Sequence, residues 1–201
     1  MRLRPAAFWI DAAVKAALVA LLVFAVARRD LPQFQGKAVV GRALTYPLAT
    51  LIVPAVWALV RRRRPVAYPY DLDILIVLPF LVDTVGNALN LYDTIDWWDD
   101  ANHFVNWGIL VAGFGRLLVR LRLGRLETAA LAIGFGAVTA VLWEFGEYLT
   151  FIRNNENELR TAYTDTLGDL ALGLGGSVVA AVLTVTALWP LRRATSPGRR
   201  S

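Results

Sequence analysis

The sequence predicts an all-α, polytopic membrane protein, built as a bundle of six transmembrane helices with both termini in the cytoplasm. Three observations lead to this fold class. Hydrophobic residues make up 57% of the 201 residues and charged residues only 18%, a balance that is unusual for soluble domains. Several segments are long and apolar enough to span a bilayer. The basic residues cluster in the joins between these segments, mainly on one side.

Six segments qualify as spans, because a helix that rises 1.5 Å per residue needs roughly 20 residues to cross the hydrocarbon core. They cover residues about 6–27, 38–60, 70–91, 101–121, 128–152 and 165–189. Short polar joins separate them, so residues 1–201 are predicted to form a single transmembrane domain. Residues 192–201 are predicted to be a basic cytoplasmic tail.

The first span has a competing interpretation. Arg2 and Arg4, the apolar stretch and Ala25-Val26-Ala27 together imitate a cleavable secretory signal. Asp11 and Lys15 make this segment more polar than most signal sequences, which favours a retained span. These two residues are four apart, so they can pair on one helix face, and a bridge at the lipid-facing surface is the simplest expectation for them.

The distribution of arginine predicts the orientation. If six helices alternate, one side receives the basic groups at positions 2–4, 61–64, 116–125 and 192–200. The opposite side receives only Arg28, Arg29, Lys37, Arg153 and Arg160. The positive-inside rule then places both termini in the cytoplasm of a multi-pass inner (plasma) membrane protein. Because the basic groups flank spans, the net charge of +5 indicates topology and a bilayer partner, and no nucleic acid.

Small residues predict where the helices approach each other closely. Ala132, Gly136 and Ala140 form a row on the fifth span. On one side of the sixth lie Gly168, Gly173, Gly176 and Ala180. Such rows allow backbones in membranes to pack at short range.

The composition limits the chemistry of any site. The chain has no cysteine and one histidine, His103, so thiolate ligands, thiol nucleophiles and zinc sites with several imidazoles are excluded. A metal site would therefore consist mainly of oxygen ligands. Two further acids, Asp71 and Asp73, begin the third span, where they are expected to favour the helix dipole.

Ionisable residues of the last four spans converge on one depth, the outer third of the bilayer. The third and fifth spans run outward and carry acids near their ends, whereas the fourth and sixth run inward and carry them near their starts. Helical spacing puts the groups of each span on one face. The residues are Asp83; Asp99 or Asp100 with His103; Glu144 with Glu147; and Asp165 with Asp169.

Carboxylates gathered at one depth in lipid would repel each other unless a cation or shared protons offset them. A divalent metal meets this need, as in helical bundles with inward carboxylates. Mg²⁺, Mn²⁺ and Ca²⁺ suit the set, with Fe²⁺ and Zn²⁺ as further options. The predicted metal ligands are Asp83, Asp100, His103, Glu144, Glu147, Asp165 and Asp169.

Three functions remain open from the sequence, and so does whether the protein is an enzyme at all. The first is a metal-dependent hydrolase or transferase that acts on a lipid or lipid-linked substrate, with Glu147 or Asp169 as general base and His103 as ligand or acid. The alternatives are a proton- or cation-coupled transporter that uses the same carboxylates and a non-catalytic membrane subunit. A fourth interpretation is purely structural, with protonated acids hydrogen-bonded between helices. The oligomeric state is left open.

Three motifs carry a family resemblance: Asp-Asp-Ala-Asn-His-Phe from Asp99, Trp-Glu-Phe-Gly-Glu-Tyr from Trp143, and Tyr-Thr-Asp-Thr-Leu-Gly-Asp-Leu from Tyr163. Over residues about 70–185 the chain resembles the YjdF-like small bacterial inner-membrane proteins, a family without an established biochemical activity. The resemblance implies that the acids and His103 of these motifs belong to one set. It does not name their chemistry.

Overall fold

The computed structural model describes residues 3–150 and 152–188, and these residues form helices and no strands. The long helices are α1 (Leu3–Ala27), α2 (Val39–Arg61), α3 (Tyr70–Ala88), α5 (Trp98–Arg120), α6 (Arg125–Thr150) and α7 (Glu156–Leu183). Between or after them lie η1 (Pro32–Phe34), α4 (Leu91–Thr94), η2 (Ile152–Asn154) and the π-helical η3 (Thr184–Leu188). The tail predicted for residues 192–201 lies outside the described residues.

The long helices coincide with the predicted spans, and the main difference is the start of α7. This helix begins at Glu156, whereas the predicted span begins at residue 165. Asn155 caps the helix, because its side chain accepts a hydrogen bond from the backbone N–H of Asn157. Glu156 and Glu158 in the first turn also favour the helix dipole. A polar helical extension therefore precedes the apolar part of α7.

Four helical stretches are long and apolar enough to cross a membrane: Ala6–Ala27, Val39–Arg61, Arg125–Asn154 and Glu156–Ala187. The two remaining long helices, α3 and α5, carry buried polar residues. α3 carries Asp71, Asp73 and Asp83, and α5 carries buried Asn102 and His103. The chain is therefore a polytopic helical membrane protein in which α3 and α5 bring the polar groups.

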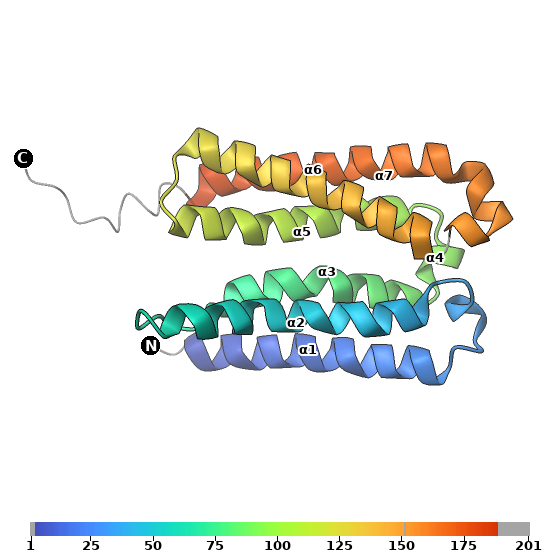
Figure 1. Cartoon of the computed structure of the whole chain (residues 1–201), viewed down its shortest axis with the longest axis horizontal. Coiled ribbons are helices and arrows are strands. Elements are labelled where there is room, and N and C mark those ends of the chain that lie inside the picture. The colour runs from blue at the N-terminus through green and yellow to red at the C-terminus, as the bar shows by residue number, and fades with distance from the viewer. Residues whose placement is uncertain (1–2, 151, 189–201) are drawn as a thin grey trace, which may run out of the picture.

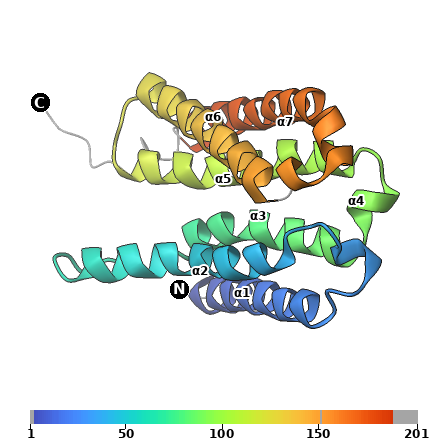
Figure 2. The same cartoon turned by 45° about the vertical axis from the view of Figure 1, so that its right-hand side comes forward.

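The helices form two layers of three (Figure 1). α3 packs on α1 and α2 in one layer, and α7 packs on α5 and α6 in the other. The two layers meet mainly where α3 packs on α5, and the same arrangement is visible after a rotation (Figure 2). α2 and α6 also face each other across the layers, but they are not extensively packed. α3 and α5 thus occupy the middle of the bundle.

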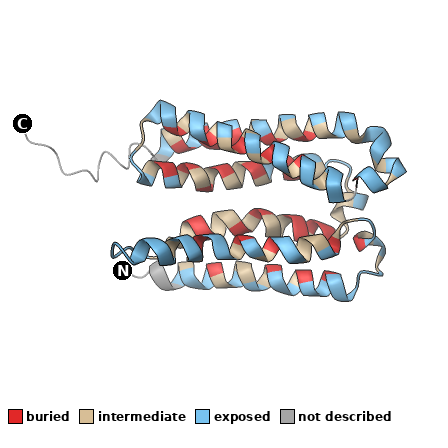
Figure 3. Ribbon diagram, in the orientation of Figure 1, coloured by how far each residue is buried: buried red, intermediate tan, exposed pale blue. Residues whose placement is uncertain are grey.

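Apolar side chains cover the outside of the bundle, as lipid requires. Large aliphatic residues such as Leu44 and Leu126 are 72% and 80% exposed, while Asp83, His103 and Asp169 are buried. Figure 3 shows the buried residues concentrated on the faces that the helices turn toward each other. Exposed apolar and buried polar residues are the pattern expected when the surrounding solvent is hydrocarbon.

Glycines allow α5 and α7 to pack at close range, as the rows of small residues predict. A Cβ atom at Gly173 would meet the Trp107 ring, and one at Gly176 would collide with the backbone carbonyl of Phe104. Gly136 on α6 similarly faces Ser177 on α7. These contacts fix how near α7 lies to α5 and α6, and therefore fix the position of Asp169.

We expect Gly176→Ala to destabilise the protein by about 1–3 kcal/mol, because the added methyl group forces two helix backbones apart. Thermal unfolding in detergent measures the effect. Gly175→Ala is the matched control, since a Cβ there meets only the Phe104 ring at 3.5 Å, an ordinary contact. Equal unfolding temperatures for the two variants would contradict this packing.

The acids at the start of α3 do more than favour the helix dipole. Asp71 forms ion pairs with Arg116 and Arg120 of α5, each at 2.7 Å. Asp73 is fully buried and binds both Lys15 of α1 and the Tyr68 hydroxyl. The sequence pattern could not reveal the basic partners, because the lysine and the two arginines lie far away in the chain. Lys15 also pairs with Asp11 at 3.2 Å, so the pair expected from the spacing is confirmed. Because Asp11 and Asp73 are buried, this pair faces the bundle interior, contrary to the expected bridge at the lipid surface.

Candidate functional site

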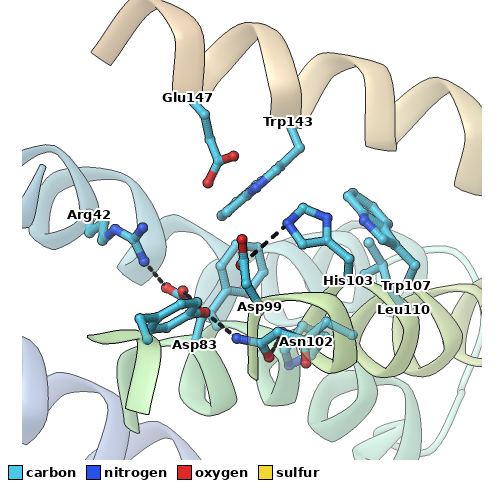
Figure 4. Close-up of a pocket in the computed structure, with 13 residues that line it drawn as sticks. Arg42, Asp83, Asp99, Asn102, His103, Trp107, Leu110, Trp143 and Glu147 are labelled. Carbon is cyan, nitrogen blue, oxygen red and sulfur yellow. Dashed lines mark hydrogen bonds and ion pairs between the residues drawn. The ribbon is translucent and has the colours of Figure 1, made fainter. Parts of the chain in front are cut away.

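A polar cavity of about 80 Å³ lies between α2, α3, α5 and α6. It is near the end of the bundle that carries α4, where α6 ends and α7 begins (Figures 1 and 4). Arg42, Asp83, Asp99, His103 and Glu147 contribute its polar groups. Trp107 and Trp143 provide apolar walls. The cavity thus gathers charged side chains from four helices inside an apolar bundle.

His103 lies at the centre of the acidic residues. Its Nε2 atom is 3.7 Å from an Oδ1 of Asp99, one turn earlier on α5, and 3.6 Å from Oδ1 of Asp169 on α7. Its Nδ1 atom is 3.9 Å from Oε1 of Glu144 on α6. Three helices therefore supply carboxylates to one imidazole that is only 7% exposed.

These distances are too long for hydrogen bonds and suit a cation between the groups. An N–H···O bond has its heavy atoms about 2.7–3.2 Å apart. Two ligand atoms that each lie about 2.0–2.4 Å from a shared metal ion are themselves about 3–4 Å apart. The separations of 3.6–3.9 Å around His103 fall in that range. Moreover, Nδ1 of His103 is buried and has no hydrogen-bond partner among the described residues, which is costly for a polar atom.

Two groups of residues bring potential ligand atoms within 4.8 Å of one another. One is Asp99, His103 and Asp169, and the other is His103, Glu144 and Glu147. Helical periodicity explains one pair of ligands in each group, Asp99 with His103 and Glu144 with Glu147, because residues three or four apart share a helix face. Packing of α6 and α7 against α5 supplies the rest. His103 is common to both groups.

The charge of this cluster is not balanced by protein cations. Among the ion pairs of residues 3–150 and 152–188, none joins a lysine or arginine to Asp99, Glu144, Glu147 or Asp169. Carboxylates at such short range repel each other unless protons or a metal ion are bound. The cluster could therefore hold a cation or share protons.

Asp83 belongs to a different network on the far side of the cavity (Figure 4). Its carboxylate pairs with Arg42 of α2 and accepts hydrogen bonds from the hydroxyls of Tyr46 and Tyr92, at 2.6 and 2.7 Å, and from the Asn87 amide. These donors occupy its oxygen atoms, and neither candidate metal group includes it. Asp83 therefore ties α2, α3 and α4 together beside the cluster.

Asp100 and Asp165 are exposed, and neither belongs to the two candidate metal groups. Both lie close enough to act electrostatically on the cluster, Asp100 on His103 and Asp165 on Glu144 and Asp169. Asp99 holds the position next to His103 that the sequence analysis assigned to Asp100. Burial in the structure makes this choice. Asp100 shares its helix face with Phe104, which is exposed, whereas Asp99 shares its face with His103, which is buried. The structure thus brings His103, Glu144, Glu147 and Asp169 together and adds Asp99.

Arg42 of α2 also lines the cavity. It is mostly buried, with 16% of its side chain exposed, and it binds Asp83 across two helices. Tyr92 and Asn102 extend the network, because the Asn102 amide donates to the Tyr92 hydroxyl and Asn106 donates to Asn102 at 2.7 Å. A continuous polar chain therefore connects α2 and α3 to the face of α5 that carries His103.

The family comparison covers nearly the whole chain. A family model described as "Predicted membrane protein (DUF2238)" matches residues 10–189. The chain belongs to this family. The match extends the resemblance expected for residues 70–185 to α1 and α2, which the motifs did not cover. Searches of curated proteins and of solved structures found no match. The family description assigns no chemistry, so any assignment rests on the geometry around His103.

Proposed function

We propose that this member of the family is a metal-dependent membrane hydrolase or transferase that acts on a lipid or lipid-linked substrate. The observation that carries the proposal is the buried, unpartnered Nδ1 atom of His103 among carboxylates from three helices. A metal ion at that position would satisfy the imidazole nitrogen and neutralise the acids together.

The proposed topology has six spans with both termini in the cytoplasm and the site in the outer third of the bilayer. Six long helices and the clustering of arginines at alternate joins support it. With this orientation, the end of the bundle that carries α4 and the cluster faces the extracytoplasmic side. A substrate would then reach the site from the outer leaflet.

The proposed first ligands are Nδ1 of His103 with Glu144 and Glu147. Nδ1 is the nitrogen nearest Glu144, and the two glutamates lie on one face of α6. The Nε2 side of the ring is near Asp99 and Asp169. A carboxylate there would accept a hydrogen bond from Nε2–H. This bond would fix the tautomer and orient the ring, as in other metal-bound histidines.

The donor set favours hard cations. Carboxylate oxygens with one imidazole suit Mg²⁺, Mn²⁺ or Ca²⁺, and they also accept Fe²⁺ or Zn²⁺. Bound there, the metal would polarise the phosphoryl or acyl oxygen of the substrate and lower the pKa of water.

The residues around the metal would handle the protons. Asp169, which is not among the proposed first ligands, would take the proton of the attacking water while the oxygen of that water bonds to phosphorus or to the acyl carbon. The bond between phosphorus or the acyl carbon and the leaving oxygen then breaks. The leaving oxygen would receive the proton that the carboxylate took from the water. Trp107 and Trp143 would limit the entry of other water molecules.

Metal content tests the proposal directly. We expect the detergent-purified protein to contain about one divalent metal per chain, or to bind one with micromolar affinity, by elemental analysis and titration. In vesicles of phosphatidylglycerol and phosphatidylethanolamine, the loaded protein should release water-soluble or deacylated products that vanish with a chelator. A protein that binds no metal would refute the metal site. A metal-bound protein that turns over no lipid would refute the enzymatic role.

One observation favours a second candidate, a proton- or cation-coupled carrier. Asp73, which is fully buried and pairs with Lys15, lies ten residues before Asp83 on α3, or about 15 Å along the helix. α3 thus carries buried carboxylates toward both ends of the bundle, as a relay requires. Substrate-dependent uptake into vesicles that is abolished by both Asp73→Asn and Glu144→Gln would favour the carrier over the enzyme.

A further inference from the structure

A second cavity lies between α2 and α6, the two long helices that face each other across the layers. Its volume is about 210 Å³, and mainly apolar atoms line it. An apolar cavity of about 150 Å³ in a protein already accepts a molecule of the size of benzene. The space is therefore sufficient for a segment of a hydrocarbon chain.

Glycine creates this space. A Cβ atom added at Gly41 on α2 or at Gly146 on α6 would meet nothing within 4 Å. Both residues line the cavity, in contrast to Gly136, Gly173 and Gly176, which are packed against neighbouring helices. The two glycines thus leave a groove unfilled, whereas the other three bring helices together.

The groove continues into the polar cavity beside the cluster. Arg42, Trp143 and Glu147 line both cavities, and Figure 4 shows Arg42 and Glu147 on opposite sides of the same space. Arg42 offers an ion pair to Asp83 through one nitrogen, Nη1. A guanidinium has five N–H donors, so it can bind a phosphate oxygen as well.

We propose that this groove binds an acyl chain of an anionic phospholipid, whose phosphate group reaches Arg42 and the metal-binding carboxylates. Both helices that form the groove are membrane-spanning by length and hydropathy, so its surroundings are lipid chains. Arg42 gives the preference for a negatively charged headgroup. As a substrate route, this inference rests on the proposed function, and it names the substrate class.

The chain has no native cysteine, so a single cysteine introduced in the groove can be labelled specifically. Thr45→Cys places a thiol in the groove, and Leu48→Cys places one on the exposed side of the same helix, outside the groove. Each variant is labelled with bimane and reconstituted in phosphatidylcholine vesicles with a minor fraction of phosphatidylglycerol brominated on its acyl chains. Bromine quenches the fluorophore on contact.

We expect quenching at position 45 to exceed quenching at position 48 by roughly fivefold, as a single favourable contact of arginine with an anionic lipid would give. Brominated phosphatidylcholine should show no such preference. In the Thr45→Cys background, Gly146→Leu should fill the groove and abolish the preference. Gly134→Leu is the matched control, because a Cβ at this α6 position also meets nothing within 4 Å but lies outside the groove.

Failure of the groove and failure of the metal site give different results. Equal quenching at positions 45 and 48, or a preference that survives Gly146→Leu, would overturn the lipid groove even in a protein that binds metal. Preferential quenching in a protein without metal would support the groove and remove the proposed enzyme. Displacement of quenching by a polyisoprenyl phosphate, with no effect of added phosphatidylglycerol, would also overturn the phospholipid as occupant.

Discussion

Replacing His103 with alanine is expected to lower the affinity for the divalent metal by at least about 100-fold. The imidazole is the only group shared by the two sets of potential ligands, so its removal damages both. Elemental analysis of the purified variant and titration with Mn²⁺ or Zn²⁺ measure the loss. Activity on lipid, where present, should disappear with it.

Two neighbouring aspartates test the site further, with Asp100 as the matched control for Asp99. Asp99 is near Nε2 of His103, and Asp99→Asn should weaken metal binding by about 10- to 100-fold, the usual cost of losing a carboxylate that orients a histidine ligand. Asp100→Asn, one residue later and exposed, should leave the affinity unchanged. If His103→Ala retains full metal content, or if the Asp100 variant loses more metal than the Asp99 variant, the assigned site is wrong.

Asp83→Asn is expected to have the largest effect on stability, about 3–5 kcal/mol. The substitution leaves the charge of Arg42 unpaired in a mostly buried position and weakens the acceptor of the Tyr46 and Tyr92 hydroxyls. Thermal unfolding in detergent, supported by the yield of folded protein, measures the loss. Metal content of the surviving folded fraction should remain close to wild type, because Asp83 lies outside the cluster.

An exposed pair and a double variant distinguish this result from a general effect of lost charge. Asp93 pairs with Lys37 at 2.8 Å in an exposed position, so Asp93→Asn should cost less than about 1 kcal/mol. Arg42→Met combined with Asp83→Asn should recover part of the stability, since no unpaired charge remains. Strict additivity of the two single substitutions would mean that the buried ion pair does not carry the effect.

Much of the fold follows from local properties of the chain. The six long helices lie at the positions of the six predicted segments, and four helical stretches are long and apolar enough to cross a membrane. Length and hydropathy are properties of consecutive residues, so the sequence alone indicates them. The small residues of α6 and α7 likewise indicated close packing, and Gly136, Gly173 and Gly176 are indeed at helix contacts. Gly168 is not, because a Cβ atom there would meet nothing within 4 Å. The early start of α7 was missed because its first turns are polar and depend on the cap at Asn155.

The candidate site was only partly predictable, because the sequence pattern describes each helix by itself and not how neighbouring helices are oriented. Spacing of three or four residues put Glu144 beside Glu147 and an aspartate beside His103, but spacing alone could not choose between Asp99 and Asp100. Asp83 shares the expected depth with the cluster, yet its partner is Arg42. Depth fixes one coordinate of a side chain, whereas contact also depends on which way each helix is rotated.

The sequence by itself determined the membrane character of the protein, its helices and the set of acids that could meet around its single histidine. These depend on composition and on helical periodicity, which act over a few turns. Only the tertiary structure decided that Asp99 accompanies His103, that Asp83 belongs to an arginine, and that α2 and α6 leave a groove between them. The physical reason is that helix rotation and spacing are set by contacts such as Gly176 against Phe104, between residues distant in the chain.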